Sequence, residues 1–396
     1  MSQEVSVLDF GSGKITVLIG KRGINNTLVL SGIGESNYAG FCNGEFFDPG
    51  NLSYAVAHAI NAAEAAARTT IEHLIVGVPG EFTTAVCQDV SISLTKKRKV
   101  LESDLDALHE MGNNFKNNPE YTLINSQPIY YTLDDGRKII QPVGLTSNKL
   151  GGHISYVLAE NSFIDKVDNL LKELNIESYD YMSSLVAESM FLFDDNIRDR
   201  FVVFIDSGRI TTSVAVVQGD GILAQYNVPM GGGHITNELA YEFGIGYTQA
   251  ENLKHKIALN LSASDDDVYT ITTNRSDTVE FSAKRANDAV SSVIWVIADT
   301  ITKSLKECSY DYPDYIPYHL TGGGIAYIKG ASELLAKYLK RPVEVVAPSL
   351  PQSARPHLSS SLGLLDMAIR ITPQQTKTTG FFKKLFRFGK KRGGNQ

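Results

Sequence analysis

Three glycine turns, each at the end of a β-rich run, constrain the fold of this chain most strongly. They are Gly11-Ser12-Gly13, Asp206-Ser207-Gly208 and Gly322-Gly323-Gly324. The first two look like copies, because residues 7–17 and 204–214 both give a strand, an aspartate, a turn and a second strand. Glycine lets backbone N–H groups approach a phosphate without a Cβ clash. The pattern therefore predicts a duplicated α/β frame that binds a nucleotide.

Each turn also has an ordinary structural interpretation, as a plain hairpin or a strand-to-helix loop. The near-repeat at Asp206 favours the nucleotide-binding interpretation, in which a small hydroxyl and backbone N–H groups hold a phosphate chain. The first turn supplies these parts through Gly11, Ser12, Gly13 and Lys14. The triple glycine would form a flat floor under a purine and its α-phosphate. Asp9 and Asp206 could share one Mg²⁺ through its water shell, since Mg²⁺ takes only one or two carboxylates.

Length and composition suit a protein with two or more domains. The chain has 396 residues, of which 43% are hydrophobic and 20% charged, and this is too long for one compact core. Cys42, Cys87 and Cys308 have no spacing typical of a disulfide framework or a zinc site. Neither a secretory signal nor a run of about 20 apolar residues is apparent. We expect a protein of the reducing cytoplasm.

The charges are divided unevenly between the body of the chain and its end. Residues 377–396 contain seven Lys or Arg and no acid, which leaves 30 basic and 44 acidic residues in the remainder. An acidic body argues against general nucleic-acid binding, because that requires a positive surface. The basic end calls for a separate explanation.

Six segments spread over the whole chain carry a resemblance to known proteins, and they are residues 8–14, 44–48, 76–79, 231–237, 250–254 and 320–324. They resemble the actin-like ATPases, a superfamily that includes actin, the heat-shock chaperones and the sugar kinases. Within it, the chain is most similar to the FtsA family of bacterial cell-division proteins. It implies an α/β protein with an actin-like two-domain fold, in which duplicated sheet-and-helix cores surround a nucleotide cleft. It also implies a small inserted α+β subdomain used for self-association and for contacts with other division proteins.

We expect the chain to be divided accordingly. The expected parts are the N-terminal part of the first core (1–82), the inserted subdomain (83–178), the first part of the second core (179–258), its outer subdomain (259–310), the second part of the second core with a closing helix (311–370), a flexible linker (371–380) and an amphipathic tail (381–396).

The resemblance also assigns roles to residues that the pattern alone leaves open. Glu251 and Lys254 would flank the ribose and adenine, whereas by spacing alone they are a helical i, i+3 ion pair. The nucleotide-binding residues that we expect are Asp9, Gly11, Ser12, Gly13, Lys14, Asp206, Ser207, Gly208, Gly232, Glu251, Lys254, Gly322, Gly323 and Gly324, and the cofactors are ATP and Mg²⁺.

The second turn departs from the family pattern. It keeps one glycine where the family usually has three, and Arg209 and Ile210 follow it. Arg209 either pairs with a phosphate, for which its planar fork is suited, or points into solvent. Ser184 stands where relatives carry a water-orienting Gln or Glu, and Glu188, one turn later, is a weak candidate to replace it. We therefore expect bound ATP with slow hydrolysis or none.

The end of the chain has the pattern of an interfacial membrane helix, with an apolar and a basic face. The residues of this predicted anchor are Phe381, Phe382, Lys383, Lys384, Leu385, Phe386, Arg387 and Phe388. A nucleic-acid arm or a helix docked on an acidic partner are the alternatives. Anionic lipids are the expected ligand, and because one short helix binds weakly, self-assembly would increase the avidity.

Taken with the resemblance, these features favour a membrane-tethered protein that polymerises and anchors the tubulin-like FtsZ at the division septum, on the cytoplasmic face of the membrane. FtsZ would bind the subregion around residues 261–308. One alternative is an actin-like assembly platform of a pilus or secretion system. A sugar-kinase-type phosphotransferase is a further alternative, although such an enzyme has little use for a Phe-rich basic tail. The base preference and the filament geometry stay open.

Overall fold

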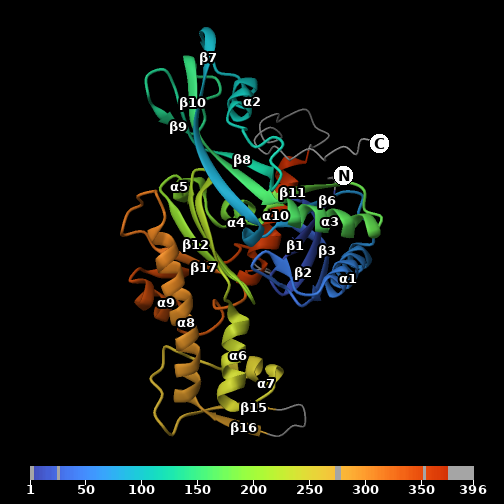
Figure 1. Cartoon of the computed structure of the whole chain (residues 1–396), viewed down its shortest axis with the longest axis vertical. Helices are drawn as coiled ribbons and strands as arrows, with labels where there is room; N and C mark the ends of the chain where they lie inside the picture. The colour runs from blue at the N-terminus through green and yellow to red at the C-terminus, as the bar shows by residue number, and fades with distance from the viewer. Residues whose placement is uncertain (1–3, 25–26, 273–277, 351–353, 373–396) are drawn as a thin grey trace.

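The computed structural model describes residues 4–24, 27–272, 278–350 and 354–372. The molecule is elongated, with an inserted module at one end, two sheet-and-helix cores in the middle and a helical subdomain at the other end (Figure 1). The predicted tail, 381–396, and all but the start of the predicted linker lie outside the described residues. In the described part of the chain no helix is both long and apolar enough to span a bilayer.

The first core is built on a five-stranded sheet in the order β11-β6-β1-β2-β3. Its strands are β1 (Val5–Phe10), β2 (Lys14–Arg22), β3 (Leu28–Asn37), β6 (Leu74–Val78) and β11 (Tyr179–Ser183). β1 pairs antiparallel with β2 and parallel with β6, and its six residues are all buried. Burial on both faces explains why β1 is an almost continuous apolar run.

The Ala-rich helix α1 (Pro49–Ala67) covers this sheet. It begins where Asp48 accepts a hydrogen bond from the Asn51 backbone N–H at 3.0 Å and Pro49 occupies the first turn, both typical of helix starts. Between β3 and α1 lie the short strands β4 (Phe41–Cys42) and β5 (Glu45–Phe46). Gly34 on β3 lets α1 approach closely, since a Cβ there would lie 1.9 Å from the Ala59 carbonyl oxygen.

The second core repeats this architecture, in the order β14-β13-β12-β17-β18. Its strands are β12 (Val202–Ser207), β13 (Thr212–Gln218), β14 (Gly221–Val228), β17 (Tyr318–Thr321) and β18 (Val343–Val345). β12 pairs antiparallel with β13 and parallel with β17, as β1 does with β2 and β6. Asp9 stands opposite Thr16 and Asp206 opposite Ser213. The predicted duplication of the two-domain α/β frame is confirmed.

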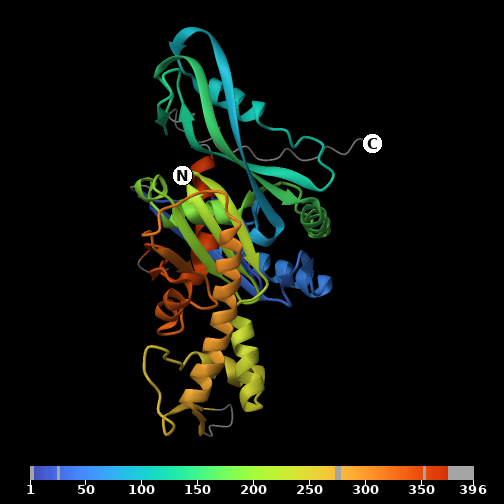
Figure 2. The same ribbon diagram turned by 60° about the vertical axis from the view of Figure 1, so that its left-hand side comes forward.

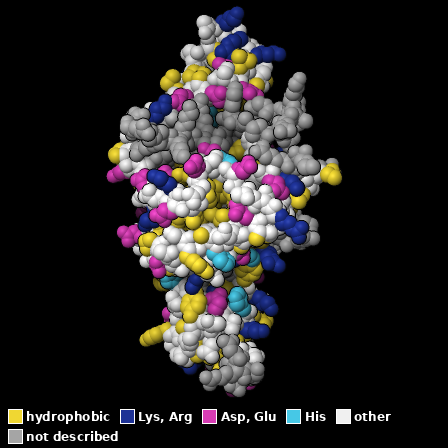
Figure 3. Space-filling model, turned by 90° about the vertical axis from the view of Figure 1, so that its right-hand side faces the viewer, with side chains coloured by type: hydrophobic (Ala, Val, Ile, Leu, Met, Phe, Trp, Pro, Cys, Tyr) yellow, Lys and Arg dark blue, Asp and Glu magenta, His cyan; other side chains and the backbone are white. Residues whose placement is uncertain are grey.

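The inserted module has a four-stranded sheet in the order β7-β10-β8-β9. Its elements are β7 (Thr83–Lys99), α2 (Glu102–Met111), β8 (Tyr121–Thr132), β9 (Lys138–Ile139) and β10 (Thr146–Glu160). A separate small core lies under α2 and includes Leu108 and Tyr156. Lys and Arg side chains gather at the outer end of the module (Figure 3), where β7 ends with the exposed residues Lys96, Lys97 and Lys99.

The predicted boundaries of this module and of the second core need correction. Helix α3 (Asn161–Glu173), which the sequence analysis placed in the module, packs Phe163 and Val167 into the first core. The module therefore ends near residue 160 rather than 178. β11 and α4 (Ser184–Leu192) also belong to the first core. The sequence does not show which core these elements pack against, because residues near a strand-to-helix junction look the same in either case.

The closing helix also returns to the first core. α10 (Ser359–Ile371) packs on α4 and β1, and its Leu364 and Leu365 lie in the first core. The sequence analysis had grouped this helix with the second core. The turn η3 (Pro356–Leu358) leads into it. The chain thus crosses between the cores a second time, at the floor of the cleft that separates them.

The outer subdomain extends from the second core, with helices α6 and α8 side by side (Figures 1 and 2). The remaining elements of the described chain are η2 (Gly80–Phe82), α5 (Asp195–Arg198), α6 (Gly232–Phe243), α7 (Tyr247–Lys254), β15 (Val268–Thr272), β16 (Thr278–Ser282), α8 (Ala283–Lys306) and α9 (Ala331–Leu339). β15 and β16 pair antiparallel at the far end of this subdomain (Figure 1). α8 buries its apolar stripe, including Ile294 and Ile297, in the second core.

Candidate functional site

The three glycine turns meet around one cavity of about 710 Å³ between the cores, a size typical of a small-ligand site. The predicted residues that line it are Asp9, Gly11, Ser12, Gly13, Lys14, Glu188, Asp206, Gly208, Gly232, Glu251, Lys254, Gly322, Gly323 and Gly324. Ser207 is not in the lining; its hydroxyl accepts a hydrogen bond from Thr212 Oγ1 at 3.2 Å behind the wall. Whether these residues bind a nucleotide stays a prediction, but the structure brings them together.

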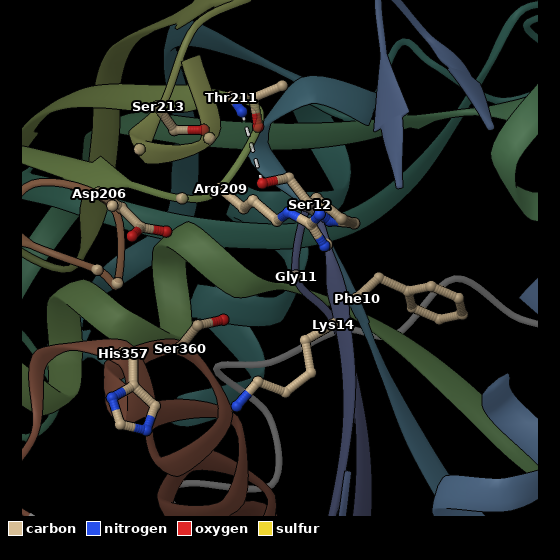
Figure 4. Close-up of a pocket in the computed structure, with 18 of the residues that line it drawn as sticks. Phe10, Gly11, Ser12, Lys14, Asp206, Arg209, Thr211, Ser213, His357 and Ser360 are labelled. Carbon is tan, nitrogen blue, oxygen red and sulfur yellow. Dashed lines mark hydrogen bonds between the residues drawn. The ribbon is translucent and has the colours of Figure 1, made fainter. Parts of the chain in front are cut away.

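The first and second turns contact each other directly across the cavity. Ser12 Oγ accepts hydrogen bonds from the backbone N–H groups of Ile210 at 3.0 Å and Thr211 at 3.5 Å, and Figure 4 shows the second of these. The second turn is closed by a bond of 2.9 Å from the Gly208 N–H to the Thr211 carbonyl. The Ser12 hydroxyl thus joins backbone donors of the second core to the first core.

The third turn packs against the second turn and the start of α6. The Gly324 N–H donates to the Ser207 carbonyl at 2.6 Å. A Cβ at Gly232 would lie 2.5 Å from the Gly324 Cα, so α6 begins in contact with this turn. Gly322 has a φ of +87° and leaves no room for a Cβ, which would lie 2.3 Å from Asp206 Oδ1. Glycine is therefore required there for both conformation and space.

Glu251 and Lys254 form the ion pair that helical spacing predicts, and this pair also contacts the start of α6. Lys254 is buried, and its Nζ donates to Glu251 at 2.8 Å, to Thr236 Oγ1 at 3.0 Å and to the Gly232 carbonyl at 3.1 Å. Burial alone would raise the pKa of Glu251, but hydrogen bonds from Lys254 and Thr236 more than offset it, so the pKa is lowered. The pair ties α7 to the start of α6.

Two aspartates from equivalent strands face the cavity. Burial raises the pKa of Asp9 to about 7, with a smaller contribution from Asp206, although hydrogen bonds from Ser360 and Ser184 oppose the rise. Those hydroxyls donate to Asp9 Oδ1 at 2.9 and 3.5 Å. Burial also raises the pKa of Asp206 to about 6. Within the described ion pairs, neither carboxylate has a basic partner.

Glu188 lies beside these two acids on the wall of the cavity. Its side chain is 1% exposed and neither carboxylate oxygen has a hydrogen-bond partner among the described residues. Burial, followed by repulsion from Asp206 and Asp9, raises its pKa well above the usual value. Glu188, a weak candidate on the sequence alone, does line the cavity. No group of three His, Cys, Asp or Glu side chains in the described chain is arranged to hold a metal ion directly.

Several lining residues escaped the sequence analysis. Tyr327 and His357 meet at the cavity, with 2.6 Å between the Tyr327 hydroxyl and His357 Nδ1. Tyr327 follows the triple glycine by three positions, which is a usable signal. Ser360 contacts Asp9 across 351 positions of sequence, and no local pattern indicates this. Arg209, for which two orientations were open, lies in the wall of the cavity, and Figure 4 shows its side chain extending toward the first turn.

Comparison with known proteins places this arrangement in a family. The family model "Cell division protein FtsA" matches residues 203–363, and the model "SHS2 domain inserted in FTSA" matches residues 80–158. The second range agrees with the module boundary near residue 160. The chain is 22% identical over 377 residues to "Cell division protein FtsA" of Neisseria meningitidis serogroup B, covering 93% of this chain and 90% of that protein.

Two solved structures are similar in fold. One belongs to a "PilM-PilN type IV pilus biogenesis complex" (TM-score 0.61, 16% identity, 93% of this chain and 99% of that chain covered). The other is MreB5 of Spiroplasma citri bound to ADP (TM-score 0.52, 12% identity, 91% and 94% covered). These likenesses confirm the expected actin-like fold.

Proposed function

Because the chain belongs to the FtsA family of actin-like cell-division proteins, we propose that it binds ATP, self-assembles and anchors the FtsZ division ring to the cytoplasmic face of the membrane at the septum. One observation carries the proposal: the glycine turns of two duplicated cores meet at a single cavity. In such a site a phosphate chain would hold the two cores together. Nucleotide binding would then control the shape in which the protein assembles.

Three features of the cavity support ATP as the ligand. Backbone N–H groups on a tight turn such as Gly11-Ser12-Gly13 are suited to phosphate oxygens, and the start of α6 contributes the positive end of a helix dipole. The triple glycine offers a flat surface beside the Glu251–Lys254 pair. The relative MreB5 was solved with ADP bound, and its fold is shared by this chain.

Mg²⁺ is the cation that the acidic wall fits. Asp9 and Asp206 are carboxylates whose raised pKa values reflect desolvation without a neighbouring base. A divalent cation between them and a phosphate chain would favour their ionised forms. Because Mg²⁺ retains several waters, we propose that both aspartates hold it through its hydration shell. The cation would neutralise phosphate charge as the nucleotide binds.

We propose that hydrolysis is slow or absent. Ser184 donates to Asp9 and is too short to orient a water for attack on a terminal phosphate. Glu188 is buried with a raised pKa, so it is a poor general base near neutral pH. Steady-state assays with labelled ATP in excess over the protein test this proposal. A steady rate of several turnovers per second that disappears in Asp206→Ala would contradict it.

Membrane tethering and FtsZ recruitment can be tested together by liposome co-sedimentation. Anionic liposomes, the cognate FtsZ with GTP and the full chain with ATP should pellet together. A variant lacking residues 380–396 should leave both proteins in the supernatant, because those residues contain the predicted anchor, Phe381 to Phe388. Unchanged pelleting of the truncated protein would contradict the anchor. Neutral liposomes serve as the control, since the basic face of the anchor requires anionic lipid.

The FtsZ contact is proposed on the outer subdomain, within residues 261–308. Trp295 on α8 is 53% exposed, and aromatic residues are common anchors of protein interfaces. Trp295→Ala should reduce FtsZ capture in a pull-down by at least about tenfold, in the range of an interface hot spot. Tyr315→Ala is the matched control, because Tyr315 is 82% exposed and lies outside this subdomain. Equal capture by both variants would exclude Trp295 from the contact.

A second candidate function is an assembly platform of a pilus or secretion system. It is favoured by the similarity to the pilus biogenesis complex, which extends over 93% of the chain. The co-sedimentation assay separates the two, since a platform protein would not carry FtsZ to liposomes.

A further inference from the structure

Arg209 is the residue at which the second turn departs most from the glycine pattern, and its side chain enters the cavity. The stem lies against the first turn: a Cβ at Gly13 would be 2.5 Å from Arg209 Cδ and 3.1 Å from its Cβ. Figure 4 shows the side chain running from the second turn toward Ser12 and Lys14. The chain thus places a cation between the two turns that were predicted to hold phosphate.

The backbone of Arg209 is fixed from both sides. Its carbonyl accepts a hydrogen bond of 2.7 Å from the Gly233 N–H at the start of α6. The N–H of the next residue, Ile210, donates to Ser12 Oγ. These bonds hold Arg209 in register with the first core and with α6, so the guanidinium starts from a defined position.

An aromatic ring supports the guanidinium group. The Arg209 Cζ lies 5.3 Å from the centroid of the Tyr247 ring at the start of α7, within the range of a cation–π contact. Such stacking leaves the in-plane N–H donors free. An arginine stacked in this way loses less rotamer freedom when it binds an anion.

The charge of Arg209 has no counter-ion in the described part of the chain. The other arginines of the second core that lie near acids are paired, as Arg198 is with Asp220 at 2.7 Å and Arg285 with Glu242 at 2.7 Å. Arg209 forms neither an ion pair nor a hydrogen bond from its guanidinium to a described residue. It is exposed within the cavity mouth, so its donors are available to a ligand.

We infer that Arg209 binds the terminal phosphate of a nucleoside triphosphate and makes the cavity discriminate a triphosphate from a diphosphate. The inference rests on the proposed nucleotide binding and extends it to a specific subsite. Two parallel N–H donors can engage two oxygens of one phosphate group. The purine is proposed to lie on the third turn, whereas the Arg209 side chain lies against the first turn, between the two turns that would hold the phosphate chain. A diphosphate lacks the terminal phosphate, so it would leave the Arg209 guanidinium without a partner.

Calorimetric titration of the full-length protein with Mg·ATP and with Mg·ADP tests the inference. Arg209→Ala should weaken ATP binding by about tenfold, the loss expected for one charge-assisted pair at a partly exposed site. ADP binding should change less than about twofold on the same argument. Arg209→Lys keeps the charge but loses the two parallel N–H donors, so its ATP affinity should lie between those of the wild type and Arg209→Ala. Tyr247→Ala should reduce the preference for ATP, and Tyr247→Phe should retain it.

Arg285→Ala is the matched control, because Arg285 is also stacked on an aromatic ring, 5.1 Å from the centroid of Phe243, but does not line the cavity. It should leave both affinities unchanged. Thermal melting of each variant verifies that it is folded. An unchanged ATP affinity in folded Arg209→Ala, or equal losses for ATP and ADP, would overturn the inference while the proposed ATP binding stands. A wild-type protein that binds neither nucleotide would overturn both.

Discussion

At the scale of single residues, the cavity contains carboxyl groups whose environment favours the protonated form. Asp9 is buried, receives hydroxyl hydrogen bonds from Ser360 and Ser184 and faces Asp206. Glu188 has no hydrogen-bond partner among the described residues. Ionising these buried carboxyl groups would lower the stability of the folded chain. A bound cation, as proposed above, would favour the ionised forms and offset this cost.

Asp9→Asn should make the stability of the nucleotide-free protein less sensitive to a rise in pH from about 4 to about 7. The folded-state pKa of Asp9 is raised to about 7 from 3.8, so between these values the folded protein keeps a proton that the unfolded chain releases. The free energy of unfolding therefore falls as pH rises through this window. Since one pKa unit is about 1.4 kcal/mol, the advantage of Asp9→Asn over wild type should grow by about 1–3 kcal/mol between pH 5 and pH 8.

Urea denaturation without nucleotide or divalent cation, at several pH values, measures this difference. Glu4→Gln is a suitable control, because Glu4 is an acid of the same core that pairs with Lys21 at the surface. A pH-independent difference between Asp9→Asn and wild type would show that the environment of Asp9 does not shift its titration.

At the scale of elements, the cavity is shaped by turns that pack closely against one another and against the start of α6. α6 starts against the third turn, and the third turn is bonded to the second. Each approach depends on a glycine, because any Cβ would separate the two segments. These contacts connect the ends of β12 and β17 with the start of α6, whose first N–H groups donate to carbonyls of the second turn.

Gly322→Ala should destabilise the protein more than Gly144→Ala. Both glycines have positive φ, +87° and +88°, but a Cβ at Gly144 meets nothing within 4 Å, whereas one at Gly322 would meet Asp206 Oδ1 at 2.3 Å. Gly144→Ala should therefore cost only backbone strain, about 1 kcal/mol. Gly322→Ala should cost about 1–3 kcal/mol more, as overpacking does, and should weaken ATP binding. Chemical denaturation measures the stability of both variants. Equal losses of stability would show that Gly322 and Asp206 can move apart without cost.

At the scale of the whole molecule, the inserted module contacts both cores. Its strands emerge from the first core, and it also lies on β14 of the second core, where Ser155 Oγ donates to the Ile222 carbonyl at 2.6 Å. Gln225 of β14 donates to Thr83 Oγ1 at 2.9 Å at the base of the module. Rotation of one core against the other would strain these contacts. The module is thus positioned to respond to the state of the cleft.

Gln225→Ala should lower the free energy of unfolding by about 1–2 kcal/mol, because it removes partly buried hydrogen bonds between the module and the second core. Gln218→Ala is the control on the neighbouring strand β13, since Gln218 makes one long exposed bond of 3.5 Å to the Asp199 carbonyl; its effect should be within about 0.5 kcal/mol. Differential scanning calorimetry measures both changes. Indistinguishable melting of Gln225→Ala and wild type would mean that these bonds do not couple the two parts.

Much of the fold could be predicted from the sequence because its signals are local. The strand, aspartate and glycine pattern identified the two equivalent turns. The helix α3 was assigned to the wrong part, since its apolar stripe does not tell which core it faces. Ser360 was missed as a partner of Asp9 because the contact joins residues 351 positions apart.

The sequence by itself determined that this chain has two copies of one glycine-turn frame, because glycine and aspartate at strand ends are constrained by backbone geometry that adjacent residues set. The actin-like fold was implied by the resemblance of segments along the whole chain. Only the tertiary structure decided that Arg209 lies in the cavity rather than in solvent and that Glu188 faces Asp9 and Asp206. These outcomes depend on how two cores pack across a cleft, and no local pattern in the sequence records that packing.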